Sequence, residues 1–247
     1  MHSPLVLLLL ALACAASFGP ARAQSLGAPP LLTPFSSDSE QAPAPWQVQG
    51  LPNQTKPFTR FAVVDLDGRR ALRVQAEESY GNLVHPLSGL KPGSKLAWRW
   101  RVDKLIDGAN LNEKTGDDVA LKVCVFFDQP LESIPFIERQ LLRVARSQTG
   151  QALPAATVCY VWDNDLPRGA LLPSAFTRRL RYMVLQSGAA QLRQWVDERR
   201  DIGADFLRLF GDEVSVLPQV IGVAVGADAD NTRSRSLGYV SDLVLLH

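Results

Sequence analysis

The chain has 247 residues, of which 46% are hydrophobic and 21% are charged, with 26 Lys and Arg against 25 Asp and Glu. This is the composition of a folded globular protein, not of a disordered or low-complexity chain. The balanced charge argues against a protein that holds nucleic acid through phosphate contacts, because that function needs a concentrated basic excess. Three His and three Cys leave little material for a metal cluster or for Cys–His catalysis.

The N-terminal segment has the pattern of an export signal. The apolar run 5–13 is too short to cross a bilayer, which takes about 20 residues, and the small-x-small sequence Ala21-Arg22-Ala23 follows it. The pattern predicts a signal peptide over residues 1–23 and a periplasmic or secreted mature protein. The alternative is a lipoprotein anchored through Cys14. No later apolar run is long enough to span a membrane.

The mature chain is expected to begin with a linker or arm rich in Pro and Ala over residues 24–45, followed by one domain over residues 46–247. Only Cys124 and Cys159 remain after cleavage. Both lie in strand-like segments and could form a disulfide in an exported protein. The alternative is two free, buried cysteines that pack as small hydrophobic residues.

Short segments of alternating polarity recur from residue 60 onward and predict β-strands. In the clearest example, Trp98 and Trp100 share one face while Arg99 and Arg101 share the other. Turn sequences such as Asp67-Gly68 separate the segments. The strand candidates are 61–66, 72–76, 95–103, 119–127, 158–162, 181–186, 219–227 and 239–246. Many short strands with few helices predict a β-sandwich or jelly roll.

Two segments have helical periodicity instead. The first is predicted to start at a Ser133 cap and to end near Arg146, with an apolar stripe of Ile134, Ile137, Leu141 and Val144. The second follows Asp201 and places Ile202, Phe206, Leu209 and Phe210 on one face, before Gly211. Each helix is expected to bury its stripe by covering a sheet or closing one end of the sandwich.

Carboxylates at strand ends are the most plentiful reactive groups. The candidates are Asp117, Asp118, Asp163, Asp228, Asp230 and Asp242. The densest cluster, Asp228-Ala-Asp230-Asn231-Thr232, could supply oxygen ligands to Ca²⁺, but these side chains also suit bonds to their own backbone in a tight turn. The turn is the favoured interpretation, so no metal or other cofactor is predicted. Asp242 is expected beside this loop if 239–246 is the adjacent strand.

Three further features could contact a ligand. Arg99 and Arg101 would suit acidic groups if their face of the strand is concave, and otherwise are ordinary surface charges. Trp162, beside Asp163, is a candidate for stacking on a sugar ring. The small-residue row of Gly222, Ala224 and Gly226 either leaves room for a ligand or permits close packing, and packing is favoured.

Several of these motifs together resemble a known bacterial family. The sequences Leu96–Val102, Gly116-Asp117-Asp118, Tyr160-Val161-Trp162, Glu198–Ile202 and Asp228–Thr232 occur in the order typical of domain of unknown function 3047 (DUF3047). The resemblance covers roughly residues 46–246 and implies an exported β-sandwich related in outline to galactose-binding-like and jelly-roll modules. It implies no activity. The family usually has Thr at the position of Ala229 and Gly at that of Arg233, which further weakens the metal interpretation.

Three functions follow from these observations. The first is a non-catalytic module that binds an envelope or extracellular ligand, foremost a glycan. The second is a carbohydrate-active enzyme that uses two of the aspartates as a catalytic pair. The third is an envelope scaffold whose partner is another protein. The predicted fold, the surplus of aromatic residues and of aspartates at strand ends, and the absence of nucleophile motifs favour the first.

Overall fold

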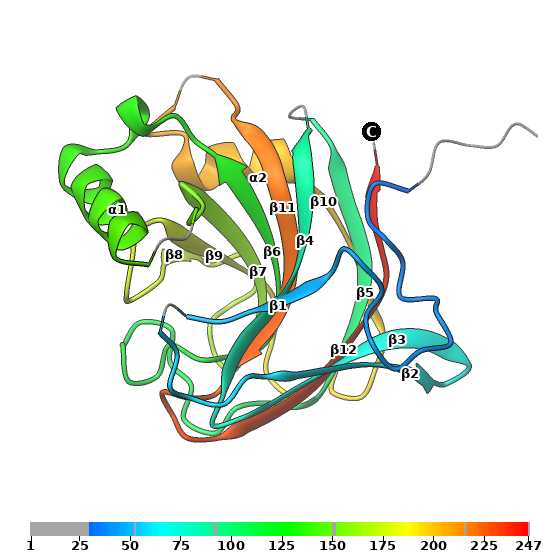
Figure 1. Cartoon of the computed structure of the whole chain (residues 1–247). Helices are drawn as coiled ribbons and strands as arrows, with labels where there is room; N and C mark the ends of the chain where they lie inside the picture. The colour runs from blue at the N-terminus through cyan, green and yellow to red at the C-terminus, as the bar shows by residue number, and fades with distance from the viewer. Residues whose placement is uncertain (1–29, 52, 91–92, 150–151, 215, 247) are drawn as a thin grey trace, which may run out of the picture.

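The computed structural model describes residues 30–51, 53–90, 93–149, 152–214 and 216–246, and two sheets pack face to face in it (Figure 1). The seven-stranded sheet has the order β1-β4-β11-β6-β7-β9-β8, and the five-stranded sheet has the order β10-β5-β12-β3-β2. The strands are β1 (Gln47–Gln49), β2 (Arg60–Leu66), β3 (Arg69–Glu77), β4 (Tyr80–Leu90), β5 (Lys95–Lys104), β6 (Val119–Asp128), β7 (Ala156–Asp163), β8 (Leu171–Pro173), β9 (Leu180–Ser187), β10 (Val196–Asp201), β11 (Gln219–Asp228) and β12 (Arg235–Leu246). Every neighbouring pair is antiparallel except β7 and β9. The predicted β-sandwich is confirmed.

The core lies between the sheets and is built by the alternation that the sequence displays. Trp98 and Trp100 of β5 are at most 2% exposed and point toward the seven-stranded sheet. The Trp100 ring lies 5.8 Å from that of Trp162 on β7, and the Trp98 ring lies 5.3 Å from that of Tyr160. The predicted faces of β5 are therefore confirmed.

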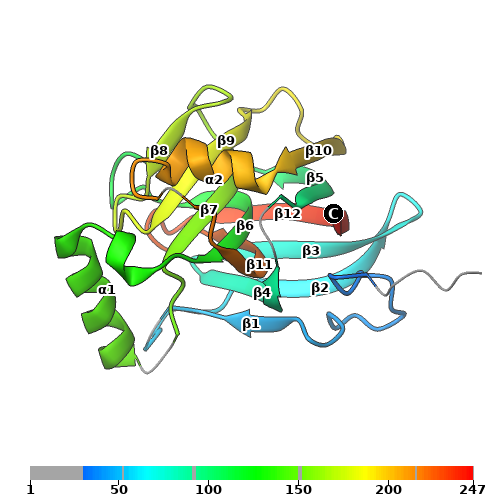
Figure 2. The same ribbon diagram turned by 90° about the horizontal axis from the view of Figure 1, so that it is seen from above.

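The two α-helices differ in how they bury their apolar faces. α2 (Ile202–Phe210) begins at Asp201, whose side chain accepts a hydrogen bond from the Ala204 N–H, and its stripe is buried at one end of the sandwich (Figure 2). α1 (Phe136–Thr149) follows the short 3-10 turn η1 (Leu131–Ser133). It begins after the predicted Ser133 cap, whose hydroxyl donates to the Pro130 carbonyl instead.

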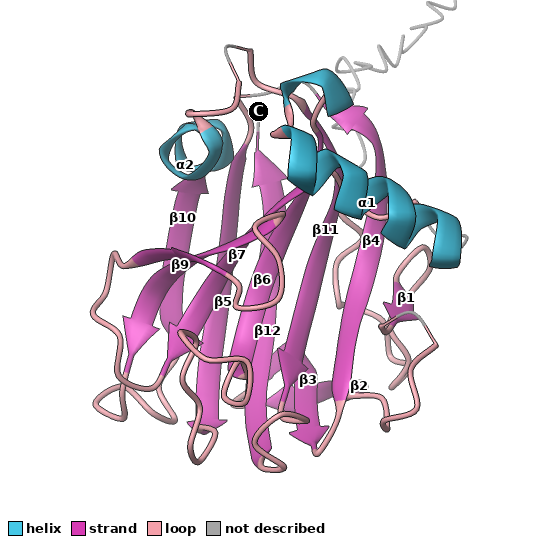
Figure 3. Cartoon of the chain, turned by 90° about the vertical axis from the view of Figure 1, so that its left-hand side faces the viewer, coloured by secondary structure: helices cyan, strands magenta, loops and turns pink. Residues whose placement is uncertain are grey.

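The predicted burial of the stripe is confirmed for Ile134, which is buried just before α1, but it is wrong for the three stripe residues within α1. Ile137, Leu141 and Val144 are 71%, 64% and 52% exposed, whereas Leu142 is the one buried residue of this helix. Periodicity identifies the residues that share a face, but it does not say whether another element covers that face. α1 lies beside the seven-stranded sheet and crosses its outer face obliquely (Figure 3).

Residues 30–45 run along the sandwich and contribute to its core. Leu32 and Phe35 are buried, and the Phe35 ring lies 4.9 Å from that of Trp46. The Thr33 N–H donates to His85 Nε2, while His85 Nδ1 lies 2.9 Å from the Pro86 carbonyl. Burial lowers the pKa of His85. The predicted signal peptide and Cys14 lie outside the described residues.

The position of β12 corrects one expectation. β12 lies in the five-stranded sheet between β5 and β3, so Asp242 is not beside the loop that follows β11. Asp242 instead forms an exposed ion pair with Arg69 at 2.5 Å. Within the described ranges, neither helix has the length and apolar character needed to cross a bilayer.

Candidate functional site

A groove lies between α1 and the outer face of the seven-stranded sheet, the face turned away from the core. Its volume is about 1190 Å³, slightly above the range of about 300–1,000 Å³ that is usual for small-molecule sites. Its floor comes from β4, β6, β7 and β11, and its walls come from α1, the segment after β1, and the segment from β8 to β9. All of these elements lie on one side of the sandwich (Figure 3).

The small-residue row of β11 lies on this outer face. A Cβ atom added to Gly226 would lie 2.2 Å from Asn82 Oδ1, and one added to Gly222 would lie 3.1 Å from the Phe126 ring. Side chains of the neighbouring strands therefore lie across the glycines and form the floor themselves. The close neighbours of these glycines belong to adjacent strands of the same sheet, and not to the helix or second sheet that close packing was expected to bring.

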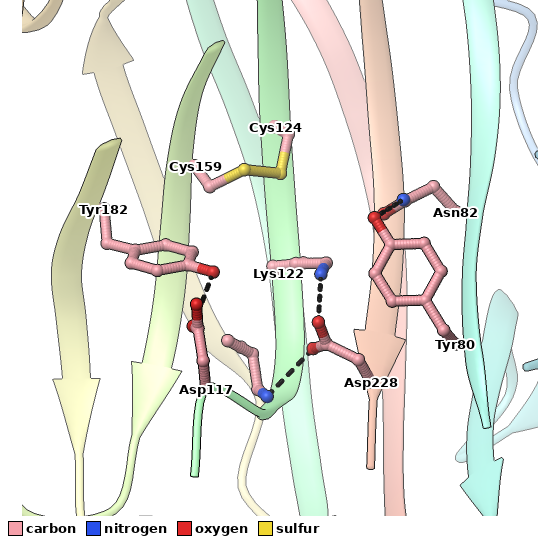
Figure 4. Close-up of a disulfide and its surroundings, with 9 residues drawn as sticks. Tyr80, Asn82, Asp117, Lys122, Cys124, Cys159, Tyr182 and Asp228 are labelled. Carbon is pink, nitrogen blue, oxygen red and sulfur yellow. Dashed lines mark hydrogen bonds and ion pairs between the residues drawn. A yellow bond between two sulfur atoms is a disulfide. The ribbon is translucent and has the colours of Figure 1, made fainter. Parts of the chain in front are cut away.

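A buried ion pair lies at one end of the floor (Figure 4). Lys122 Nζ donates to Asp228 Oδ2 at 2.8 Å, and both residues are under 5% exposed. Burial disfavours the charged ammonium, but the facing Asp228 carboxylate, together with Tyr80 and Asp117, outweighs this effect and raises the pKa of Lys122. Burial raises the pKa of Asp228 to about 6, against the attraction of Lys122. The Tyr80 ring lies 5.0 Å from Lys122 Nζ and closes the other side of the ammonium.

A second buried carboxylate, Asp117, anchors the wall that leads to β9. Asp117 accepts hydrogen bonds from the Tyr182 hydroxyl at 2.9 Å, the Ser174 hydroxyl at 2.7 Å and the Ala175 N–H at 3.2 Å. Burial, with Asp117 next in importance, raises the pKa of Tyr182 well above its ordinary value, so the phenol stays a donor. The carboxylate therefore holds the β8–β9 segment against the sheet.

A disulfide between Cys124 and Cys159 joins β6 to β7 and lines the floor (Figure 4). The two cysteines are direct partners across the antiparallel pair. Of the two alternatives left open by the sequence, the structure has the disulfide.

The groove changes in chemical character along its length. Near β1 and β4 its lining includes Gln49, Tyr80 and Asn82, and the Asn82 amide donates to the Tyr80 hydroxyl at 3.1 Å. Under α1 the lining is mainly apolar. Those apolar residues include Phe126, Phe136, Ile137, Leu141, Phe176 and Ile221.

The charged side chains that line the groove near α1 form ion pairs within the protein. Glu138 of α1 forms ion pairs with Arg178 Nε at 3.0 Å and with Arg179 Nη2 at 2.5 Å. Arg179 also forms an ion pair with the buried Glu213 at 2.6 Å. These pairs fasten the first turn of α1 to the segment before β9.

The loop 228–232 is organised by a residue outside it. Asp118 accepts bonds from the Asn231 N–H, the Thr232 N–H at 2.7 Å and the Thr232 hydroxyl at 2.6 Å. Asp230 makes no comparable contact, and its Oδ1 is buried without a hydrogen-bond partner in the described part of the chain. Burial raises the pKa of Asp230. No group of three or more His, Cys, Asp or Glu side chains suited to a metal ion occurs among the described residues.

Several predicted site residues lie away from the groove. Trp162 is 1% exposed in the core, so the expectation that it stacks on a sugar is wrong. Asp163 is buried and accepts bonds from the Asp165 and Leu166 N–H groups in a turn. Arg99 pairs with Asp197, and Arg101 pairs with Asp103 and Asp67, on the outer face of the other sheet.

Most of the residues that form the groove were not among the predicted site residues. Lys122 carried a usable signal, since it is the one charged residue inside the otherwise apolar segment Val119–Phe127. A charge within such a segment is expected to be buried and paired. Asn82, Phe126 and Phe176 carried no such signal, because only the packing of separate elements brings them together.

The two packed sheets define the chain as a β-sandwich protein. It belongs to the family described as "Protein of unknown function (DUF3047)", whose model matches residues 44–244, and this confirms the resemblance seen in the sequence. No curated protein sequence matches the chain.

Solved structures resemble the chain only distantly. The module TmCBM61 in complex with beta-1,4-galactotriose is 11% identical with a TM-score of 0.38, covering 89% of this chain and 99% of that one. Endoglucanase 3 of Trichoderma harzianum, from family GH12, is 9% identical with a TM-score of 0.39, covering 83% and 100%. The xyloglucanase domain of NopAA from Sinorhizobium fredii is 7% identical with a TM-score of 0.41, covering 83% and 99%. At these values the likeness carries no inference about the groove.

Proposed function

We propose that the protein is an exported, non-catalytic module that binds a glycan-containing ligand of the envelope or the extracellular space. The observation that supports this function is the groove itself. It joins neutral hydrogen-bonding groups at the β1–β4 end to aromatic and aliphatic side chains under α1. Sugars offer both hydroxyl groups and apolar ring faces, and such a lining suits both.

The state of the aspartates favours binding over catalysis. Asp117, Asp118 and Asp228 are at most 4% exposed, and each accepts hydrogen bonds from the protein itself. A glycosidase needs two carboxyl groups that reach the scissile bond from either side. Carboxylates committed to internal bonds are better suited to holding the groove and the loop after β11 in shape.

A glycan array on purified mature protein tests the proposal, followed by titration calorimetry with any saccharide that binds. Asn82→Ala and Gln49→Ala are each expected to weaken binding about three- to tenfold, the scale of one lost hydrogen bond. Arg99→Ala is the control, because Arg99 lies on the outer face of the five-stranded sheet. Loss of binding in the control with none in the groove variants would place the site on the wrong sheet, and the proposal would fail.

A further inference from the structure

We infer that the ligand carries an uncharged hydrocarbon chain, and that this chain lies between α1 and the sheet while the saccharide occupies the β1–β4 end. The inference rests on the proposed function and specifies the class of ligand as a glycolipid-like amphiphile. The apolar stripe of α1 is exposed, whereas that of α2 is buried.

α1 and α2 have similar amphipathic patterns and opposite outcomes. The α2 residues Ile202, Phe206, Leu209 and Phe210 are at most 6% exposed, whereas Ile137 and Leu141 of α1 are more than 60% exposed. Ile137 and Leu141 are one turn apart on the same face, and both line the groove. A folded protein rarely leaves such a stripe in water unless the stripe serves a binding site.

The other wall of the groove is apolar as well, and it belongs to the same chain. Val84, Phe126 and Ile221 lie on the sheet side, Phe136 is the first residue of α1, and Phe176 lies between β8 and β9. Phe136 and Phe176 are 66% and 58% exposed. An occupant would therefore be enclosed from two sides, which suits a flexible chain better than the surface of another folded protein.

Charge complementarity favours an uncharged occupant in this part of the groove. Glu138, which lines this part of the groove, is held by Arg178 and Arg179. Lys122, at the end near Tyr80, is neutralised by Asp228 at 2.8 Å. An acidic or basic group beneath α1 would lose its hydration without gaining a new partner. A hydrocarbon has no charge to desolvate, and it would cover Ile137 and Leu141 of α1.

The polar end of the groove, near β1 and β4, determines which end of the ligand lies there. Gln49 pairs with Asn82 across β1 and β4, and Tyr80 lies next to them, so amide and phenol groups gather at that end. A saccharide head fits there, and its chain would extend beneath α1 toward Phe176.

Maltose and octyl, decyl and dodecyl maltoside, each below its micelle concentration, provide the test by titration calorimetry. Affinity is expected to rise about fourfold for each added methylene, the factor that corresponds to about 0.8 kcal/mol per buried methylene. Ile137→Gln and Leu141→Gln are expected to reduce this rise. Val144→Gln is the matched control, since Val144 is an exposed apolar residue of the same helix that does not line the groove.

Each outcome distinguishes the two proposals. Equal affinity for maltose and for all three maltosides would overturn the chain inference and leave the glycan proposal standing. Equal affinity for dodecanoate and dodecyl maltoside would support the chain but overturn the saccharide head. Should Ile137→Gln instead convert a dimer to a monomer in sedimentation, with the maltoside affinities unchanged, a second copy covers α1 and the inference fails.

Discussion

The two faces of the seven-stranded sheet use the same strands in different ways. On β6, Val123 and Val125 point into the sandwich and pack among apolar side chains. Lys122 and Cys124, the alternate residues, point outward, yet they too are at most 3% exposed. The inner face is packed with apolar side chains, whereas the outer face combines a smaller apolar cluster with paired polar groups and a disulfide. The comparison shows how one strand supplies both a core and the floor of a groove.

The largest loss of stability is expected on the inner face. Trp98→Ala should lower the free energy of unfolding by about 3–5 kcal/mol, as large aromatic truncations in cores do. The indole nitrogen of Trp98 has no hydrogen-bond partner among the described residues, so the loss comes from packing. Denaturant unfolding measures the change. Arg99→Ala, one residue along, should leave stability nearly unchanged, and equal losses would contradict the assignment of the two faces.

A loss of similar size, with a different cause, is expected on the outer face. Lys122→Met leaves Asp228 buried without its cation and should cost about 3–5 kcal/mol. The double variant Lys122→Met, Asp228→Asn removes both charges and keeps an acceptor for the Val119 N–H. It should recover most of the loss in denaturant unfolding. If the double variant is as unstable as Lys122→Met, the ion pair is not what holds this end of the floor.

The disulfide provides a third comparison between the faces. It closes a sequence separation of 35 residues and lies on the outer side of β6 and β7. The double variant Cys124→Ala, Cys159→Ala should lower the free energy of unfolding by ~2–4 kcal/mol. Adding a thiol reductant should weaken the wild-type protein by a similar amount and leave the variant unaffected. A wild-type protein insensitive to reductant under unfolding conditions would contradict a stabilising role.

The inner face could be predicted from sequence because alternation alone determines it. The segments around Trp98 and Val123 alternate in polarity or size, and burial follows once two sheets pack together. The order of strands within the sheets could not be predicted in this way. Asp242 shows why. Its strand, β12, follows β11 directly in the sequence, yet it pairs with β5 and β3 in the other sheet.

The smallest expected losses of stability concern two aspartates in and beside the loop after β11. Asp118→Ala removes the acceptor of bonds from Asn231 and Thr232 and should cost about 2–3 kcal/mol. Asp230→Ala should change stability by less than about 0.5 kcal/mol, because its carboxylate organises nothing in the loop. Thermal and denaturant unfolding of the two variants compare them directly. A larger loss in Asp230→Ala would restore the role that the sequence suggested for that residue.

The groove could not be predicted from the sequence, for a related reason. The periodicity of α1 predicted an apolar stripe correctly, but the stripe of α2 has the same pattern and is buried. Only the distance between a helix and its sheet determines whether such a stripe forms core or lines a groove. Signals from single residues, such as the charge of Lys122, report burial without saying which face of the sheet is involved.

The central claim is that the outer face binds the ligand while the inner face remains a sealed core. Methyl chemical shifts recorded during a titration with dodecyl maltoside test it most directly. The methyl groups of Leu141, Val84 and Ile221, which line the groove, should shift in a saturable way. Those of Val123 and Val240, which lie in the core, should stay in place. Shifts confined to the five-stranded sheet, or none in the groove at saturation, would contradict the account.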